Sequence, residues 1–224
     1  MSNIINKVNQ NRQTVKSYSN KKISRAKWAQ IVDTIHWAPS SHGFEPYRVL
    51  VISKDNDLRN ELKPLMWNQG VVTEADKLVF FISLKRSVFA SKDFIQERVN
   101  RKNTLILEKE GSELLEMNKK QVELIKHTHL DAQEKTDDWA MKQAYIAMGM
   151  AMYSATLLKI GSTPIEGFVR EDVEKLLLKH KLISNDERAA VATAFGYAKT
   201  KSAYAHWGTG RRVRDAKEEK IKEI

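Results

Sequence analysis

The chain has 224 residues, of which 42% are apolar, enough for a sizeable core, so a disordered protein is excluded. Lys and Arg number 38 against 28 Asp and Glu, and the resulting formal net charge of +10 favours anionic partners or phosphorylated ligands. The absence of cysteine excludes disulfides, thiolate metal sites and a cysteine nucleophile. At about 150 residues per domain, we expect one domain with an insertion over residues 1–224.

The N-terminal pattern is not that of a targeting segment. Residues 1–10 lack the apolar stretch and the small-residue cleavage site of a secretory signal. The longest apolar stretch, residues 144–158, is shorter than the about 20 residues of a membrane-spanning helix. We therefore expect a soluble, cytoplasmic protein without a membrane partner.

The first part of the chain predicts a short N-terminal helix, a second helix and a strand. Apolar residues spaced as i, i+3, i+4, i+7 over 28–35 indicate the second helix, which Ser24 can cap. This helix must end before Pro39, because the residue preceding a proline avoids the α conformation. The sequence YRVLVI at 47–52 then predicts a strand.

The middle of the chain alternates between apolar and strongly charged segments. Residues 58–67 indicate a short helix, and the continuous apolar run at 78–84 (LVFFISL) predicts a strand that is buried on both faces. Residues 88–130 are rich in charge and sparse in apolar positions. We expect them to form an exposed helical excursion rather than a packed part of the core.

Residues 139–160 are apolar almost all round and predict a central helix that is buried on every side, in part by a partner subunit. An amphipathic helix is expected around 173–177. The segment AAVATAF at 189–195 predicts a third strand, which Gly196 ends. Residues 199–224 form a basic tail with a helix-like end. Alternating strands and helices place the fold in the α+β or α/β class.

Several common motifs are absent or weak. No G-x-G-x-x-G or Walker A sequence occurs. The run GTGRR at 208–212 suits either a phosphate cradle or a plain surface loop. His127 and His129 face apart on a helix, so we expect surface histidines and no metal site. Ser40, Ser41 and His42 are adjacent and therefore read as a turn rather than as a hydrolase site.

Four segments are informative when they are considered together. They are RQTVKSY at 12–18, WAPSSHGFEPY at 37–47, PIEGF at 164–168 and RRVR at 211–214. Their order and spacing resemble the nitroreductase family of FMN-dependent oxidoreductases, over roughly residues 8–215. The resemblance implies an α+β fold, a three-layer α/β/α sandwich with a mostly antiparallel central sheet and a helical excursion. It also implies a domain-interlocked homodimer with two FMN sites at the interface.

The resemblance also implies which residues bind FMN. Arg12 and Thr14 match family residues that contact the flavin, and Lys16 matches a residue at the pyrimidine edge of the flavin. Glu166 and Gly167 match residues that lie beside the flavin N5 atom. The turn at 39–43 matches a part that reaches FMN from the partner subunit. Arg212 and Arg214 match a phosphate-binding pair, with Arg211 as the alternative. The full implied binding set is Arg12, Gln13, Thr14, Lys16, Pro39, Ser40, Ser41, Gly43, Asn68, Pro164, Ile165, Glu166, Gly167, Arg212 and Arg214, with Lys16, Glu166 and Gly167 as catalytic residues.

Elementary chemistry agrees with these implied roles. Guanidinium groups bind a phosphate through paired hydrogen bonds. Reduced FMN carries negative charge near N1 and O2, which a cation such as Lys16 stabilises. The glycine at 167 permits a close approach of its backbone N–H.

The sequence departs from the family pattern at three places. Gly43 stands where the family often has Asn, and Glu45-Pro46-Tyr47 stands where it has Gln-Pro-Trp. Val71 replaces a Lys found in some members. These departures leave the substrate preference open.

The resemblance implies an enzyme that moves a hydride from NAD(P)H through bound FMN to a nitroaromatic, quinone or similar planar acceptor, by a ping-pong mechanism. A flavin-binding storage or redox-sensing protein without rapid turnover is the alternative. A nucleic-acid-binding protein is a third class that the net charge permits, but the chain has no recognised nucleic-acid motif, so we expect no nucleic-acid partner.

Overall fold

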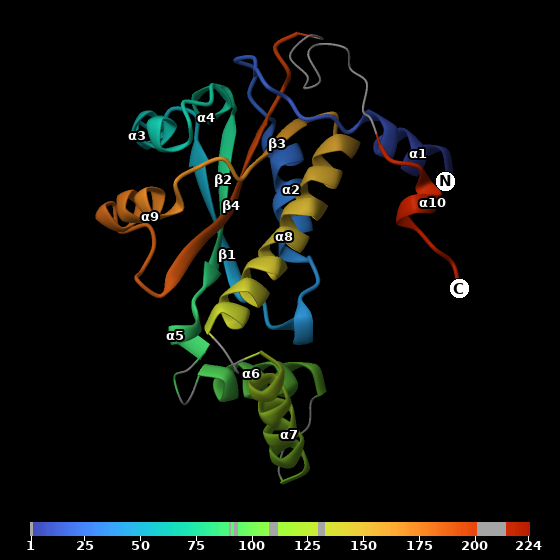
Figure 1. The fold of residues 1–224 in the computed structure, drawn as a ribbon, viewed down its shortest axis with the longest axis vertical. Helices are drawn as coiled ribbons and strands as arrows, with labels where there is room; N and C mark the ends of the chain where they lie inside the picture. The colour runs from blue at the N-terminus through green and yellow to red at the C-terminus, as the bar shows by residue number, and fades with distance from the viewer. Residues whose placement is uncertain (1, 90, 92–93, 108–111, 130–132, 201–213) are drawn as a thin grey trace.

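The computed structural model describes residues 2–89, 91, 94–107, 112–129, 133–200 and 214–224 (Figure 1). A four-stranded sheet in the order β1-β2-β4-β3 forms its centre, and every neighbouring pair is antiparallel. The strands are β1 (Tyr47–Ser53), β2 (Lys77–Leu84), β3 (Gly161–Ile165) and β4 (Glu187–Gly196). The mostly antiparallel sheet expected from the resemblance is confirmed.

The two inner strands are the most apolar segments of the sheet. All residues of β2 between its two ends are buried, and in β4 every residue except Arg188 is buried. Each of these strands is covered on both faces, which explains why an unbroken apolar run marks them in the sequence. Strands β1, β2 and β4 therefore agree with the predicted segments within two residues at either end.

Strand β3 was not predicted. It pairs with β4 from Gly161 opposite Gly196 to Ile165 opposite Ala192. Its sequence, GSTPI, contains a glycine and a proline, which are typical of turns. A proline is tolerated here because β3 lies at the edge of the sheet, where one side of the strand needs no ladder hydrogen bonds.

Helices cover both faces of the sheet, which gives the expected three layers (Figure 1). On one face, α2 and α8 pack around Phe81, Val191 and Phe195. On the other face, α3, α4 and α9 pack around Phe80 and Ile82. These helices are α2 (Arg25–His36), α3 (Leu58–Leu65), α4 (Val71–Glu74), α8 (Gln133–Leu157) and α9 (Arg170–Lys179); α1 (Ser2–Asn11) precedes them and a short 3-10 turn, η1 (Ser41–Gly43), follows α2.

Helix α2 begins and ends as its sequence predicts. The Ser24 hydroxyl accepts a hydrogen bond from the Lys27 N–H at 3.4 Å and thus caps the first turn. The helix ends at His36, three residues before Pro39. Its buried residues, Ile31 and Ile35, face the sheet and α8.

Helix α8 is not buried on every side in the single chain, so that prediction is wrong for one subunit alone. Ala140, Ala144 and Ala151 are fully buried and let the helix lie close to the sheet. On another side, however, Ile146 is 42% exposed and Leu157 is 48% exposed. One apolar stripe of this helix is therefore left uncovered by its own chain.

Three helices form a small unit at one end of the sandwich (Figure 1). They are α5 (Arg86–Phe89), α6 (Phe94–Leu107) and α7 (Ser112–His129). Contrary to the prediction, these helices have a packed core, which they share with the main body: Phe89, Val99 and Ile125 pack with Phe44 and Trp139. The high charge density of this segment hides these few apolar contacts in the sequence.

One arginine is completely buried between the helices and the sheet. Arg59 of α3 is 1% exposed, and its guanidinium donates to backbone carbonyl oxygens of Ile52 at 2.5 Å, Ala75 at 2.5 Å, Asp76 at 3.2 Å and Val72 at 3.4 Å. It thereby joins the end of β1 to the segment that leads into β2.

The described part of the tail contains α10 (Lys217–Lys220), which is exposed. Within the described residues, no helix combines the length and apolar character that a membrane crossing needs.

Candidate functional site

The segment after α1 adds an extended stretch of chain to the edge of the sheet. Thr14 forms a parallel bridge with Ser162 of β3, and the Val15 N–H donates to the Ser162 carbonyl at 3.3 Å. The Thr163 hydroxyl in turn bonds the Val15 carbonyl. After Val15 the chain bends, and Tyr18 forms an antiparallel bridge with Ala198, just beyond the Gly196 end of β4.

Side chains of this extended segment alternate between the core and the outside. Val15 is fully buried, whereas Lys16 is exposed and Arg12 and Thr14 are partly exposed. In an extended chain, residues two apart point to the same side. Thr14 and Lys16 thus turn away from the buried Val15, while Arg12 still bonds back to Val8 of α1 and the chain bends at Lys16.

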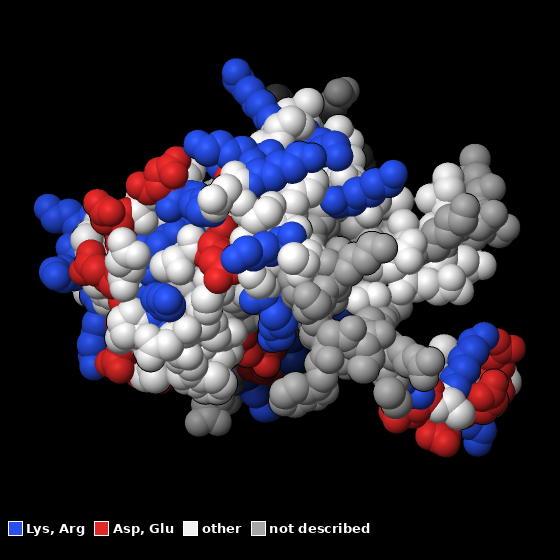
Figure 2. Space-filling view, turned by 90° about the horizontal axis from the view of Figure 1, so that it is seen from above, with Lys and Arg blue, Asp and Glu red and all other residues white. Residues whose placement is uncertain are grey.

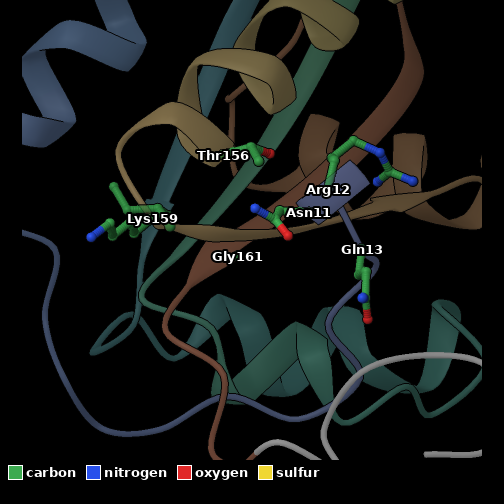
Figure 3. Close-up of a pocket in the computed structure, with 7 residues that line it drawn as sticks. Asn11, Arg12, Gln13, Thr156, Lys159 and Gly161 are labelled. Carbon is green, nitrogen blue, oxygen red and sulfur yellow. The ribbon is translucent and has the colours of Figure 1, made fainter. Parts of the chain in front are cut away.

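Arg12 and Gln13 also line a pocket of about 210 Å³ at the end of α8 (Figure 3). Lys159, which follows α8, lines the same pocket in a left-handed conformation with φ 59°. Figure 3 shows that the side chains of Arg12 and Lys159 point in opposite directions, so the pocket is not a two-cation clamp. The other lining residues are Asn11, Thr156, Ile160 and Gly161.

Gly161 is needed at this place because the added segment passes very close to β3. A Cβ atom at Gly161 would lie 2.5 Å from Cγ2 of the buried Val15. Any other residue would push the extended segment, and Arg12 with it, away from β3.

The loop after β3 carries the second group of implied residues. Pro164 and Ile165 end the strand, and Glu166 is exposed directly after it. The Phe168 N–H donates to the Glu166 carbonyl at 2.9 Å, which closes a tight turn around Gly167. Within the described part of the chain, the Gly167 N–H donates no hydrogen bond, so this donor is available to a ligand.

The turn between α3 and α4 lies against this loop. The Gln69 amide donates to the Gly167 carbonyl at 2.9 Å, and a Cβ atom at Gly167 would lie 2.7 Å from the Trp67 ring. Trp67 and Asn68 both have left-handed backbones, with φ 55° and 53°. Trp67 is 69% exposed, so the structure presents an indole beside Gly167, and Asn68, the next residue, is exposed as well.

Helix α8 contacts the same loop from the other side. The Tyr145 hydroxyl donates to Oε1 of Glu166 at 2.8 Å. Burial raises the pKa of Tyr145 to about 12, and the hydrogen bond to Glu166 and its charge add to the shift while Arg170 opposes it. Tyr145 therefore remains a protonated donor at neutral pH.

The turn at 39–43 is held on the first half of α8. The Ser41 N–H donates to Oε1 of Gln143 at 2.8 Å, and the Ser40 hydroxyl accepts from the Glu45 N–H at 2.9 Å. Gly43 has φ 57°, a left-handed conformation that glycine adopts without strain. Pro39, the first residue of this turn, is exposed.

One chain does not unite all the implied residues. Gln143, which holds the Ser41 turn, and Thr156, which lines the Arg12 pocket, are thirteen residues apart on α8, about 20 Å along its axis. The structure thus joins the segment around Thr14 to β3 and the turn that contains Asn68 to the loop 164–167, and leaves the turn 39–43 apart. Arg212 lies outside the described residues, and Arg214 is exposed in the tail.

The sequence prediction missed Tyr145, Gln69 and Trp67. Tyr145 belongs to a helix whose composition indicates only a buried element, and its partner lies 21 residues further along the chain. Gln69 directly follows Asn68, but nothing in its sequence shows that its amide turns toward Gly167. Trp67 could have been noticed as an aromatic residue next to an implied flavin contact.

The histidines agree only partly with the prediction. His127 is exposed as expected, but His129 is half-buried and stacks on Trp139 with ring centroids 4.3 Å apart. Burial and the nearby His42 lower the pKa of His129. Among the described residues, no group of three or more His, Asp and Glu side chains is placed to hold a metal ion.

Comparison with known structures defines the class of protein. A nitroreductase-like protein from Streptococcus mutans superimposes with a TM-score of 0.78 at 16% sequence identity, covering 100% of this chain and 99% of the other. A protein of Exiguobacterium sibiricum, described as a nitroreductase in complex with FMN, gives a TM-score of 0.73 at 18% identity over 97% of this chain and 96% of that chain. The fold is therefore the nitroreductase fold.

Sequence comparison identifies the family. The nitroreductase family profile matches residues 10–197. A Staphylococcus haemolyticus protein, described as an NAD(P)H nitroreductase, is 33% identical over 199 residues, which cover 88% of each chain. The chain belongs to the nitroreductase family, as the four sequence segments indicate.

Proposed function

We propose that this protein is an FMN-dependent NAD(P)H oxidoreductase that reduces nitroaromatics, quinones or similar planar acceptors. The observation that carries the proposal is the parallel bridge of Thr14 with Ser162 of β3. It supports a site in which the segment that carries Arg12 and Lys16 and the Glu166–Gly167 loop, which follows the same strand, act on one ligand. A relative 33% identical to this chain is described as an NAD(P)H nitroreductase, which supports the donor class.

The residues present fit FMN by their chemistry. Arg12 and Lys16 supply positive charge, and Gln13 and Thr14 supply polar groups between them. The Gly167 N–H is a backbone donor without a partner among the described residues. Asn68 and Trp67 offer an amide and an aromatic face beside it. A ligand with a phosphate and a flat, hydrogen-bonding ring needs these groups.

When bound, FMN supplies hydride and electron transfer, which no side chain of the protein can provide. In this proposal Arg12 and Lys16 hold its negative charge, and the Glu166–Gly167 loop orients its ring. Arg214, and Arg212 outside the described residues, join Arg12 at the phosphate. The turn 39–43 acts on the site of a partner subunit, since one chain keeps it apart.

Nicotinamide and acceptor use one binding face in turn in this proposal, so the kinetics should be ping-pong. Initial rates measured at several acceptor concentrations should give parallel lines in a double-reciprocal plot against NADH or NADPH. Lines that intersect would reveal a ternary complex and contradict the shared face.

The protein is a homodimer in this proposal, since its surface carries apolar residues that one chain does not cover. Ile146 and Leu157 of α8 are 42% and 48% exposed, and Ile4 and Ile5 of α1 are more exposed still. Figure 1 shows α1 extending away from the sandwich, where a second subunit can pack against it. Burying such side chains contributes about 1.5–3 kcal/mol each.

Sedimentation at low micromolar concentration should therefore show a dimer. Ile146→Glu should weaken the association at least about tenfold, because it places a charge in the apolar stripe. Ile221→Glu is the matched control, since Ile221 is also exposed, at 55% against 42% for Ile146, but lies in the tail. A folded wild-type monomer that retains FMN would refute the dimer.

The alternative function is flavin storage or redox sensing without rapid turnover. The exposed Glu166 and Trp67 favour the enzyme, because a storage protein gains from covering its ligand. Reduction of the bound flavin by NAD(P)H within seconds separates the two.

A further inference from the structure

The Glu166–Gly167 loop is fixed firmly from one side. The ring of Phe168, which is 8% exposed, packs on Phe80 with centroids 6.2 Å apart and anchors the end of the loop in the core. Gln69 bonds the Gly167 carbonyl, as described above. These contacts hold the backbone of Gly167 and Phe168, but none of them holds the Glu166 side chain.

The Glu166 side chain is fixed from the opposite side by α8. Its Oε1 accepts a hydrogen bond from the Tyr145 hydroxyl at 2.8 Å, although Glu166 itself is exposed. Tyr145 lies on a helix that the sheet holds rigidly through buried alanines such as Ala144 and Ala147. A rigid donor on a rigid helix is well suited to fix a loop residue, because little further freedom is lost when the bond forms.

Other charges near this pair are already engaged. The Arg170 guanidinium donates to the carbonyl oxygens of Ala189 at 3.0 Å and Ala190 at 3.4 Å. Arg170 therefore influences Tyr145 through its charge but is held on β4. Among the described residues, the side chain that donates a hydrogen bond to the Glu166 carboxylate is that of Tyr145.

We propose that Tyr145 is a positioning residue, which holds the Glu166 carboxylate so that the Gly167 N–H is presented to a planar ring bound at the loop. The inference rests on the proposed function for the identity of that ring, but the effect on the loop belongs to the protein alone. A tyrosine suits this role because its hydroxyl stays protonated at neutral pH and the ring sets the direction of the bond.

The test is Tyr145→Phe, which removes only the hydroxyl. Tyr153→Phe is the matched control, since Tyr153 lies eight residues further along α8 and is also partly buried. In protein prepared without flavin, Tyr145→Phe should speed amide exchange several-fold at Phe168, whose N–H donates to the Glu166 carbonyl and exchanges only when the loop opens. With flavin added, the dissociation constant of FMN should rise about threefold to tenfold, the effect of one net hydrogen bond. Tyr153→Phe should change neither quantity.

The variant Glu166→Ala provides a second test of the positioning role. If Tyr145 acts through Glu166, the double variant should resemble Glu166→Ala alone, whereas independent effects would add. A Tyr145→Phe protein that melts at a lower temperature but keeps wild-type exchange at Phe168 and wild-type FMN affinity would overturn the positioning role. If wild-type protein binds no FMN, the proposed function fails, while the exchange experiment still decides the role of Tyr145.

Discussion

Replacing Arg59 with methionine should lower the free energy of unfolding by about 3–5 kcal/mol. The methionine side chain keeps much of the buried volume but leaves the carbonyls of Ile52 and Ala75 without the donor that bonds each at 2.5 Å. Burial lowers the pKa of Arg59 to about 10, against the attraction of Asp76 and Asp55, so the side chain is still charged at neutral pH. Its loss therefore also removes the cation that faces the buried Asp76.

Urea denaturation at pH 7 measures this effect. Arg59→Lys keeps the charge but not the planar fork, so it should fall between wild type and Arg59→Met, and it serves if Arg59→Met does not fold. Lys63→Met, a change on the same helix at a partly exposed position, should alter stability by less than about 1 kcal/mol. An Arg59→Met protein as stable as wild type would show that the four carbonyls need no donor.

Replacing Arg12 with alanine should weaken FMN binding by about 1.5–3 kcal/mol, the range for a hydrogen bond to a charged group. Fluorescence titration of the flavin measures the change as a roughly 10-fold to 150-fold rise in the dissociation constant. Arg25→Ala is the matched control, since Arg25 is an exposed arginine at the start of α2, outside the pocket. If Arg12→Ala binds FMN with wild-type affinity, Arg12 is a surface charge that does not contact FMN.

Lys16 should behave differently although it belongs to the same segment. Lys16 is exposed after the buried Val15, whereas Arg12 lines the pocket at the end of α8. Lys16→Met should leave binding of oxidised FMN near wild type and lower the flavin midpoint potential by a few tens of millivolts, about 30 mV for each 1.4 kcal/mol. An unchanged flavin midpoint potential in a redox titration would show that Lys16 does not lie beside the flavin ring.

The inner part of the fold could be predicted from the sequence because its signals are local. The apolar run of β2 and the Ser24 cap of α2 each depend on neighbouring residues only. Strand β3 could not be predicted in this way, since its pairing with β4 outweighs the turn preference of its glycine and proline. The uncovered stripe of α8 was also missed, because composition does not tell which side of an apolar helix its own chain covers.

The candidate site likewise has one part that the sequence predicts and another part that it does not. Segment 12–16 and loop 164–167 carry recognisable sequence patterns, and the structure brings both to one strand. The contacts that hold the loop come from Tyr145 and Gln69, which belong to other elements and show no pattern of their own. Long-range side-chain contacts of this kind become visible only when the elements are placed in space.

The central claim is that the protein carries electrons from NAD(P)H through bound FMN, and anaerobic spectroscopy tests it most directly. Purified protein reconstituted with FMN should show flavin absorbance, lose it when NADH or NADPH is added without oxygen, and regain it when a quinone or nitroaromatic follows. Arg12→Ala should retain less flavin through desalting than wild type. A protein that binds no FMN, or whose bound flavin neither nicotinamide bleaches, would contradict the account.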